Sequence, residues 1–77
     1  MDETSNEVLL RDIHNTELEA DAYYNLSCGF WALARLPENE LWKAAEYSNQ
    51  HEKYQVLEQN CRLFLLKLYK LKKERGL

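Results

Sequence analysis

Two residues of this chain have the types and positions that chemistry in a helical protein requires. Glu17 occupies an inward position of the first predicted helix, and His51 lies midway along the second, in phase with two tyrosines. A carboxylate and an imidazole inside a protein can bind a metal ion or transfer a proton. A structural histidine gives the same pattern, and a hydrogen bond between His51 and Tyr23 or Tyr24 would satisfy it.

The segment from Glu17 to Tyr24, Glu-Leu-Glu-Ala-Asp-Ala-Tyr-Tyr, resembles the first helix of ferritin-like proteins, including encapsulated ferritins. In that family the first helix carries a metal-binding glutamate and a tyrosine seven residues later, and the second helix carries Glu-x-x-His. The resemblance implies iron bound by Glu17 and His51, with Tyr24 supporting them. Ser48 stands where the second glutamate is expected, and iron sites depend on such carboxylates.

The two implied ligands also fall at different heights along a folded hairpin. A turn centred near Pro37 places Glu17 opposite about Leu57 and His51 opposite about Tyr23, a mismatch of roughly one or two helical turns. The ferritin-like hypothesis therefore requires an iron site that is built between chains.

A second resemblance covers part of the same helix. Residues 20–31 are similar to the first helix of a tetratricopeptide repeat, where an aromatic residue, a leucine, a small residue and an aromatic residue recur at this spacing. The residues in those positions are Tyr23, Leu26, Ser27 and Phe30. The second helix departs from the repeat, with Asn39, Lys43 and Glu46 where small and aromatic residues are expected. One repeat could not stand alone, so the resemblance implies a repeat-derived packing module at most.

Other enzyme classes lack their motifs in this sequence. The chain contains no Gly-rich phosphate loop, no Cys or His pair at zinc spacing, and no Ser or Cys in a recognisable nucleophile context. A hairpin would hold Cys28 and Cys61 roughly 22 Å apart, too far for a disulfide, so we expect two free thiols. These features favour a non-enzymatic role.

The first helix is predicted over residues of about 5–35. Thr4 can cap it, and Glu7 completes the capping-box spacing. A second start signal at Thr16 and Glu19 permits a short helix to about His14 followed by a new one. An unbroken 3-4 spacing of eight residues favours one continuous helix instead. They are Leu10, Ile13, Glu17, Ala20, Tyr24, Ser27, Trp31 and Ala34.

Leu36-Pro37-Glu38-Asn39 is the turn signal, with the turn at about 36–38 and a second helix at about 39–74. The side of the second helix that faces the first is predicted to carry Tyr54, Leu57, Cys61, Phe64, Leu68 and Leu71. Four basic residues in its last turns offset the helix dipole, and Gly76 can close the helix. An anion-binding patch is the alternative interpretation of this basic end.

Both predicted helices carry more apolar surface than one stripe. A helix that is apolar nearly all round is buried on more than one side. We therefore expect an all-α antiparallel hairpin, a single domain over residues 1–77, that is completed into a bundle by a second copy or by another protein. The expected function is protein–protein interaction, as a small adaptor, chaperone or complex subunit. The candidate contacts are Phe30, Trp31, Leu63, Phe64 and Leu66.

Composition narrows the partners and the compartment. The chain has 77 residues, of which 45% are hydrophobic and 30% charged, so it is neither disordered nor large enough for an ample core. A net charge of -3 argues against general binding of nucleic acid. No apolar run reaches the length of a membrane span, and the Met-Asp-Glu start lacks the basic residues of a signal peptide. We expect a cytoplasmic protein that binds neither nucleic acid nor membrane.

Overall fold

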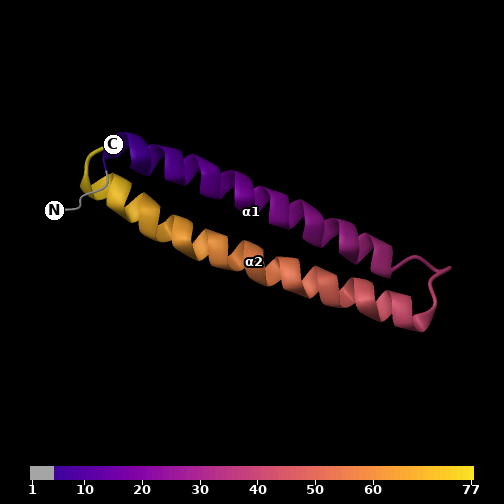
Figure 1. The fold of residues 1–77 in the computed structure, drawn as a ribbon. Coiled ribbons are helices and arrows are strands. Elements are labelled where there is room, and N and C mark those ends of the chain that lie inside the picture. Colours follow the sequence, from indigo (N-terminus) through magenta and orange to yellow (C-terminus); the bar gives the residue numbers. More distant parts are fainter. Residues whose placement is uncertain (1–4) are drawn as a thin grey trace.

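The computed structural model describes residues 5–77 and consists, over that range, of two long helices that pack side by side in opposite directions (Figure 1). α1 spans Asn6–Ala34 and α2 spans Leu41–Glu74. The predicted all-α antiparallel hairpin is confirmed. α1 runs without a break through the second start signal at Thr16, which confirms the continuous helix. The hairpin is 55 Å long and only 16 Å by 15 Å across.

α1 begins behind a serine cap. The hydroxyl of Ser5 accepts a hydrogen bond from the amide of Val8 at 3.2 Å, which satisfies one of the free amides of the first turn. The cap predicted at Thr4 lies outside the described residues.

The turn is longer than predicted and occupies residues 35–40. Because proline disfavours helical backbone at the residue before it, α1 cannot pass Leu36. The amide of Asn39 donates to the carbonyl of Leu36 at 3.2 Å, so Pro37 takes the second position of a β-turn, where its fixed φ fits. The Asn39 side chain also donates to the carbonyl of Leu33 at 2.5 Å and closes the end of α1. α2 therefore starts at Leu41, two residues later than predicted.

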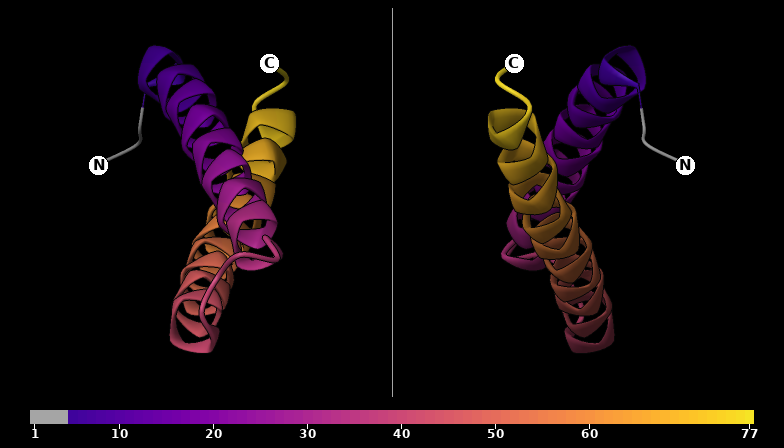
Figure 2. Two further views of the ribbon diagram at one scale, coloured as in Figure 1. Left: turned by 90° about the vertical axis from the view of Figure 1, so that its right-hand side faces the viewer. Right: turned by 90° about the vertical axis from the view of Figure 1, so that its left-hand side faces the viewer.

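The buried side of α1 is not quite the predicted stripe. Ile13, Ala20, Ser27 and Ala34 face α2 as expected, but the positions between them are taken by residues one place earlier. These residues are Leu9, Thr16, Tyr23 and Phe30, whereas the prediction had Leu10, Glu17, Tyr24 and Trp31. Both series keep the 3-4 spacing of a helix face, so spacing alone could not choose between them. The two helices cross at an angle (Figure 2), and this crossing selects which side of each helix is covered.

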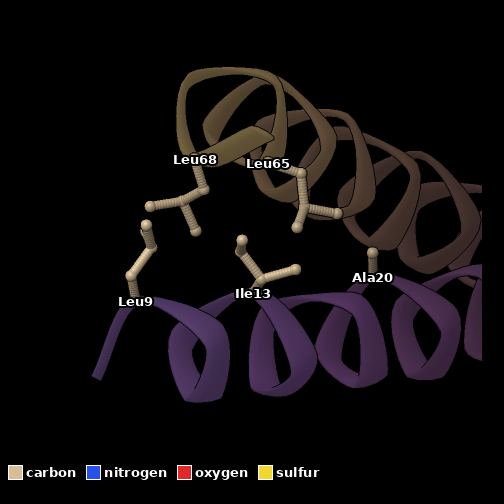
Figure 3. Close-up of a cluster of buried hydrophobic side chains, with 5 residues drawn as sticks. All are labelled: Leu9, Ile13, Ala20, Leu65 and Leu68. Atoms are coloured by element: carbon tan, nitrogen blue, oxygen red, sulfur yellow. The ribbon is translucent and has the colours of Figure 1, made fainter. Parts of the chain in front are cut away.

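The apolar core lies near the end of the hairpin away from the turn. Leu9 and Ile13 of α1 face Leu65 and Leu68 of α2, and Ala20 extends the cluster (Figure 3). Leu9 is 1% exposed. Cys61 and Leu71 pack against the cluster from its edge. The predicted Phe64 is half exposed, since Leu65 takes the inward position on that turn of α2.

Aromatic rings fill the interior toward the turn. Tyr54 stacks on Tyr23, with ring centroids 6.1 Å apart, and on Phe30 at 5.7 Å. Tyr47 lies 6.1 Å from Phe30 on its other side. These rings are only partly buried, because two helices cannot enclose them. The interior is thus narrow along its whole length.

α2 ends in a glycine cap, as the sequence predicted. Gly76 has a φ of +72°, and its amide donates to the carbonyl of Lys73 at 3.0 Å. The amide of Leu77 donates to Lys72 at 3.1 Å, which completes a Schellman motif.

The two glycines of the chain give opposite predictions for the same substitution. Gly76→Ala should lower the free energy of unfolding by about 1 kcal/mol, because alanine is strained at positive φ. Gly29→Ala should raise it by about 0.5–1 kcal/mol, because Gly29 lies inside α1 and an added methyl group meets nothing within 4 Å. Urea unfolding followed by circular dichroism measures both values. If both substitutions change the free energy of unfolding in the same direction, the placement of Gly76 at the helix end and Gly29 inside α1 is contradicted.

Candidate functional site

A groove of about 660 Å³ runs along one flank of α2. Apolar and amide side chains line it together with one ion pair. The lining residues are Gln55, Glu58, Gln59, Arg62, Leu63, Leu65, Leu66 and Tyr69. Leu63 and Leu66 are 60% and 64% exposed. We call this flank of the hairpin, including the side of α1 that borders it, the groove face.

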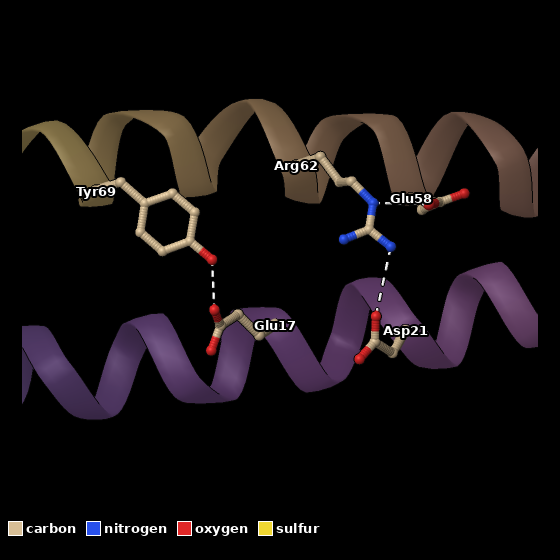
Figure 4. A network of polar contacts seen from close by, with 5 residues as sticks. All are labelled: Glu17, Asp21, Glu58, Arg62 and Tyr69. Carbon is tan, nitrogen blue, oxygen red and sulfur yellow. Dashed lines mark hydrogen bonds and ion pairs between the residues drawn. The ribbon is translucent and has the colours of Figure 1, made fainter.

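Polar contacts cross between the helices along the groove face (Figure 4). The Tyr69 hydroxyl donates to the Glu17 carboxylate. Arg62 donates to Glu58 of its own helix at 2.7 Å and reaches Asp21 of α1 at 3.4 Å. Hydrogen bonding to Glu58 raises the pKa of Arg62. The side chains of Arg62 and Asp21 are 47% and 68% exposed, so water screens the ion pair between the helices. The main effect of these contacts is to fix the register of the helices.

The contact with Glu17 raises the pKa of the Tyr69 phenol, because ionisation would lose the donated proton and place two negative charges together. Glu17→Gln should therefore lower that pKa toward its ordinary value. Since the folded-state pKa is the higher one, the contact stabilises the fold below the ordinary phenol pKa, and this contribution is lost as the pH rises through the folded-state value. Ring carbon shifts in an NMR titration, assigned with Tyr69→Phe, measure the change. If the pKa of Tyr69 is the same in the Glu17→Gln variant as in the original protein, the contact between Tyr69 and Glu17 is contradicted.

His51 is bound to the backbone and side chain of Ser27. Its Nδ1 lies 2.8 Å from the Ser27 carbonyl oxygen and 2.9 Å from the Ser27 hydroxyl. Since a carbonyl only accepts, the geometry favours a proton on Nδ1. The predicted partners were Tyr23 and Tyr24, one helical turn earlier on α1. That prediction is wrong because α2 packs about one helical turn further along α1 than a symmetric turn centred near Pro37 would place it.

The two ligands implied by the ferritin-like resemblance are not brought together within one chain. Glu17 contacts Tyr69, whereas His51 contacts Ser27, ten residues further along α1 and so about 15 Å away. Tyr24 is half exposed, and a hydrogen bond with Cys28 raises the pKa of its phenol. No group of three or more metal-binding side chains occurs among residues 5–77.

Near the turn, a smaller hollow opens on the same flank as Trp31. The hollow is lined by Trp31, Ala34, Arg35, Ser48 and His51. The Arg35 guanidinium lies 4.1 Å from the centre of the Trp31 ring, a cation–π contact. The sequence indicated Trp31 but not this hollow, which Ser48 of α2 also lines.

The five predicted contact residues fall in four different places. Leu63 and Leu66 line the groove, and Trp31 borders the hollow near the turn. Phe64 lies on the opposite flank, in a depression with Leu57 and Asn60. The Phe30 ring stacks on Tyr47 and Tyr54 of α2 and also lines a shallow hollow of α1 with Leu26 and Leu33.

Sequence reasoning missed part of the groove face. It assigned Leu10 to the interior and did not single out Arg62 or Tyr69. A seven-residue spacing could have shown the pattern on α1, where Leu10, Glu17, Tyr24 and Trp31 repeat at that interval and so share one side of the helix.

The two thiols are free, as predicted. Cys28 is exposed, and Cys61 is half-buried beside the core. Loss of water around Cys61 raises the pKa of its thiol.

Comparison of the chain with protein-family models, curated proteins and solved structures finds no match. The ferritin-like and tetratricopeptide resemblances therefore stay predictions from sequence. Within the described residues, neither helix combines the length and apolar character needed to cross a membrane.

Proposed function

We propose that this chain is a non-enzymatic protein–protein interaction module, a small adaptor, chaperone or complex subunit that binds through the groove face. The observation that carries the proposal is the distribution of apolar side chains. Five are buried between the helices, whereas fifteen large apolar or aromatic side chains of residues 5–77 are exposed by more than a third. A core this small stabilises a fold only marginally, and burial of the exposed apolar side chains by association would add to it.

The arrangement of the groove face fits recognition of a helix. It combines exposed leucines in a long concave surface with amide and charged groups at its borders. Interfaces generally have such an apolar centre and a polar rim. A groove that runs along a helix suits another helix, which contributes side chains at the same 3-4 spacing.

Site-specific photocrosslinking in cells tests this function. A benzoylphenylalanine at position 66 should form a defined protein adduct, because that side chain lies in the groove. The matched control is the same group at position 18, where a leucine of similar exposure, 55%, lines no hollow. Absence of an adduct at position 66, or equal adducts at both positions, would contradict binding through the groove face.

An iron site built between chains remains the alternative function from sequence. It predicts stoichiometric iron in native mass spectra and its loss in a Glu17→Ala, His51→Ala variant. In the hairpin, Glu17 contacts Tyr69 and His51 contacts Ser27. The interaction proposal gives these two residues no metal, so it expects the variant to leave the amount of bound metal unchanged.

A further inference from the structure

Charge is segregated between the two helices at the free end of the hairpin. The first half of α1 is acidic, with only Arg11 opposing Glu7, Asp12, Glu17, Glu19 and Asp21. The last turns of α2 are basic, with only Glu74 opposing Lys67, Lys70, Lys72, Lys73 and Arg75. In the described part of the chain, Glu7, Lys70 and Lys73 form no ion pair. Each helix thus presents charge that a second helix of opposite sign could neutralise.

We infer that the occupant of the groove face is a second copy of this chain, stacked on the first with both turns at the same end. This inference rests on the proposed function and names its partner. The two copies are related by a two-fold axis along the hairpin. α1 of each copy then packs on α2 of the other, acidic helix against basic helix, twice. Every neighbouring pair of helices in the resulting four-helix bundle is antiparallel, which also opposes their dipoles.

The opposite orientation loses this complementarity. If the copies packed head to tail, the acidic half of α1 would meet the turn end of its partner. That end carries Glu38, Glu40 and Glu46 against Arg35 and Lys43, so it has no positive excess. Like charges across an interface disfavour it.

Side-chain sizes along the groove face also match in the same-direction arrangement. A two-fold axis that runs along the hairpin does not change the position of a residue along its length. Two side chains that lie at the same position along one hairpin therefore also lie side by side when they belong to different copies. Trp31 shares the hollow near the turn with Ser48, and it therefore lies level with the same hollow of the second copy. Leu10 follows Leu9, which packs on Leu68, so Leu10 lies level with the second copy's Leu66 and Tyr69.

The exposed area of one hairpin agrees with a dimer. The chain exposes 5892 Å². Compact proteins of its mass, 9.2 kDa, expose about 4,900 Å². The excess is about 1,000 Å² per copy, close to the roughly 800 Å² per partner that a specific interface buries. A second hairpin of equal length would cover the groove face from end to end.

Distance measurement between two spin labels tests the arrangement. Cys28→Ser and Cys61→Ala remove the native thiols, and Glu74→Cys places one nitroxide at the free end of each copy. The same-direction dimer should give a label separation under roughly 35 Å, given helix spacings of 8–10 Å and the label arms. A head-to-tail dimer should give about 50 Å, since the hairpin is 55 Å long. That longer distance would overturn the inference.

Two leucines on α1 test which face of the hairpin the second copy contacts. Leu10→Gln should weaken dimerisation about tenfold in sedimentation equilibrium, whereas Leu18→Gln should leave it unchanged. Both leucines are exposed, at 43% and 55%, but only Leu10 borders the groove face. Equal effects of the two substitutions would overturn the placement of the second copy on that face.

The oligomeric state and the crosslink at position 66 together show whether the second copy, or the whole interaction proposal, is wrong. A monomer at 100 µM that crosslinks at position 66 to another protein would overturn the second copy and leave the interaction module in place. A monomer with no adduct at position 66 would overturn both. A dimer with the short label separation and a Leu10-specific loss would support both.

Discussion

Leu65→Ala should abolish cooperative unfolding of this protein, or lower its free energy of unfolding by about 2–5 kcal/mol. Leu65 is 3% exposed and packs with Ile13, Leu9 and Leu68, which are most of the apolar core. The lost side chain cannot be replaced by relaxation, since only two helices surround the site. A hairpin of this size has only a few kcal/mol of stability in total. Urea unfolding followed by circular dichroism at 222 nm measures the loss.

Leu18→Ala is the control for this variant. It removes the same atoms from an exposed position of α1, and alanine favours helix, so the free energy of unfolding should change by less than about 0.5 kcal/mol. A similar loss in both variants would show that the core is not where the structure places it.

Leu63→Gln combined with Leu66→Gln should dissociate the protein from its partner while the helices remain. Both leucines are more than half exposed in the isolated hairpin, so their loss removes no internal core. Burial of each at an interface contributes about 1.5–3 kcal/mol, and the dissociation constant should rise at least about 100-fold. Sedimentation equilibrium gives the constant, and circular dichroism gives the helix content.

Val56→Gln is the matched control on α2. Val56 is 54% exposed, similar to the two leucines, but it does not line the groove. It should leave the dissociation constant within about twofold of the original value. Loss of helicity in the Leu63, Leu66 double variant, with association unchanged, would contradict the interaction proposal.

These two predictions separate the inner side of the hairpin from its groove face. The inner side holds Leu9, Ile13, Leu65 and Leu68 and determines whether the chain folds. The groove face holds Leu63 and Leu66 and, in our proposal, determines what the chain binds. Helix α2 serves both sides because residues 65 and 66 project about 100° apart on one turn.

Local signals in the sequence determined the two helices, the position of the turn and the end of α2. Proline at position 37 stops α1, and Gly76 closes α2 through its positive φ, because each acts on the backbone beside it. The excess of apolar side chains also indicated a second buried surface. These features depend on neighbours within about four residues, so they can be recognised without the tertiary structure.

The tertiary structure alone decided the register and the inward face. α2 packs about one helical turn further along α1 than predicted, so His51 contacts Ser27 in place of Tyr23 and lies further from the level of Glu17. The crossing of the helices turned Phe30 inward and left Leu10 outside. A helix rotates by 100° per residue, so a shift of one position changes which residue is buried while the 3-4 spacing stays the same. Only the packing of one helix on the other removes that ambiguity.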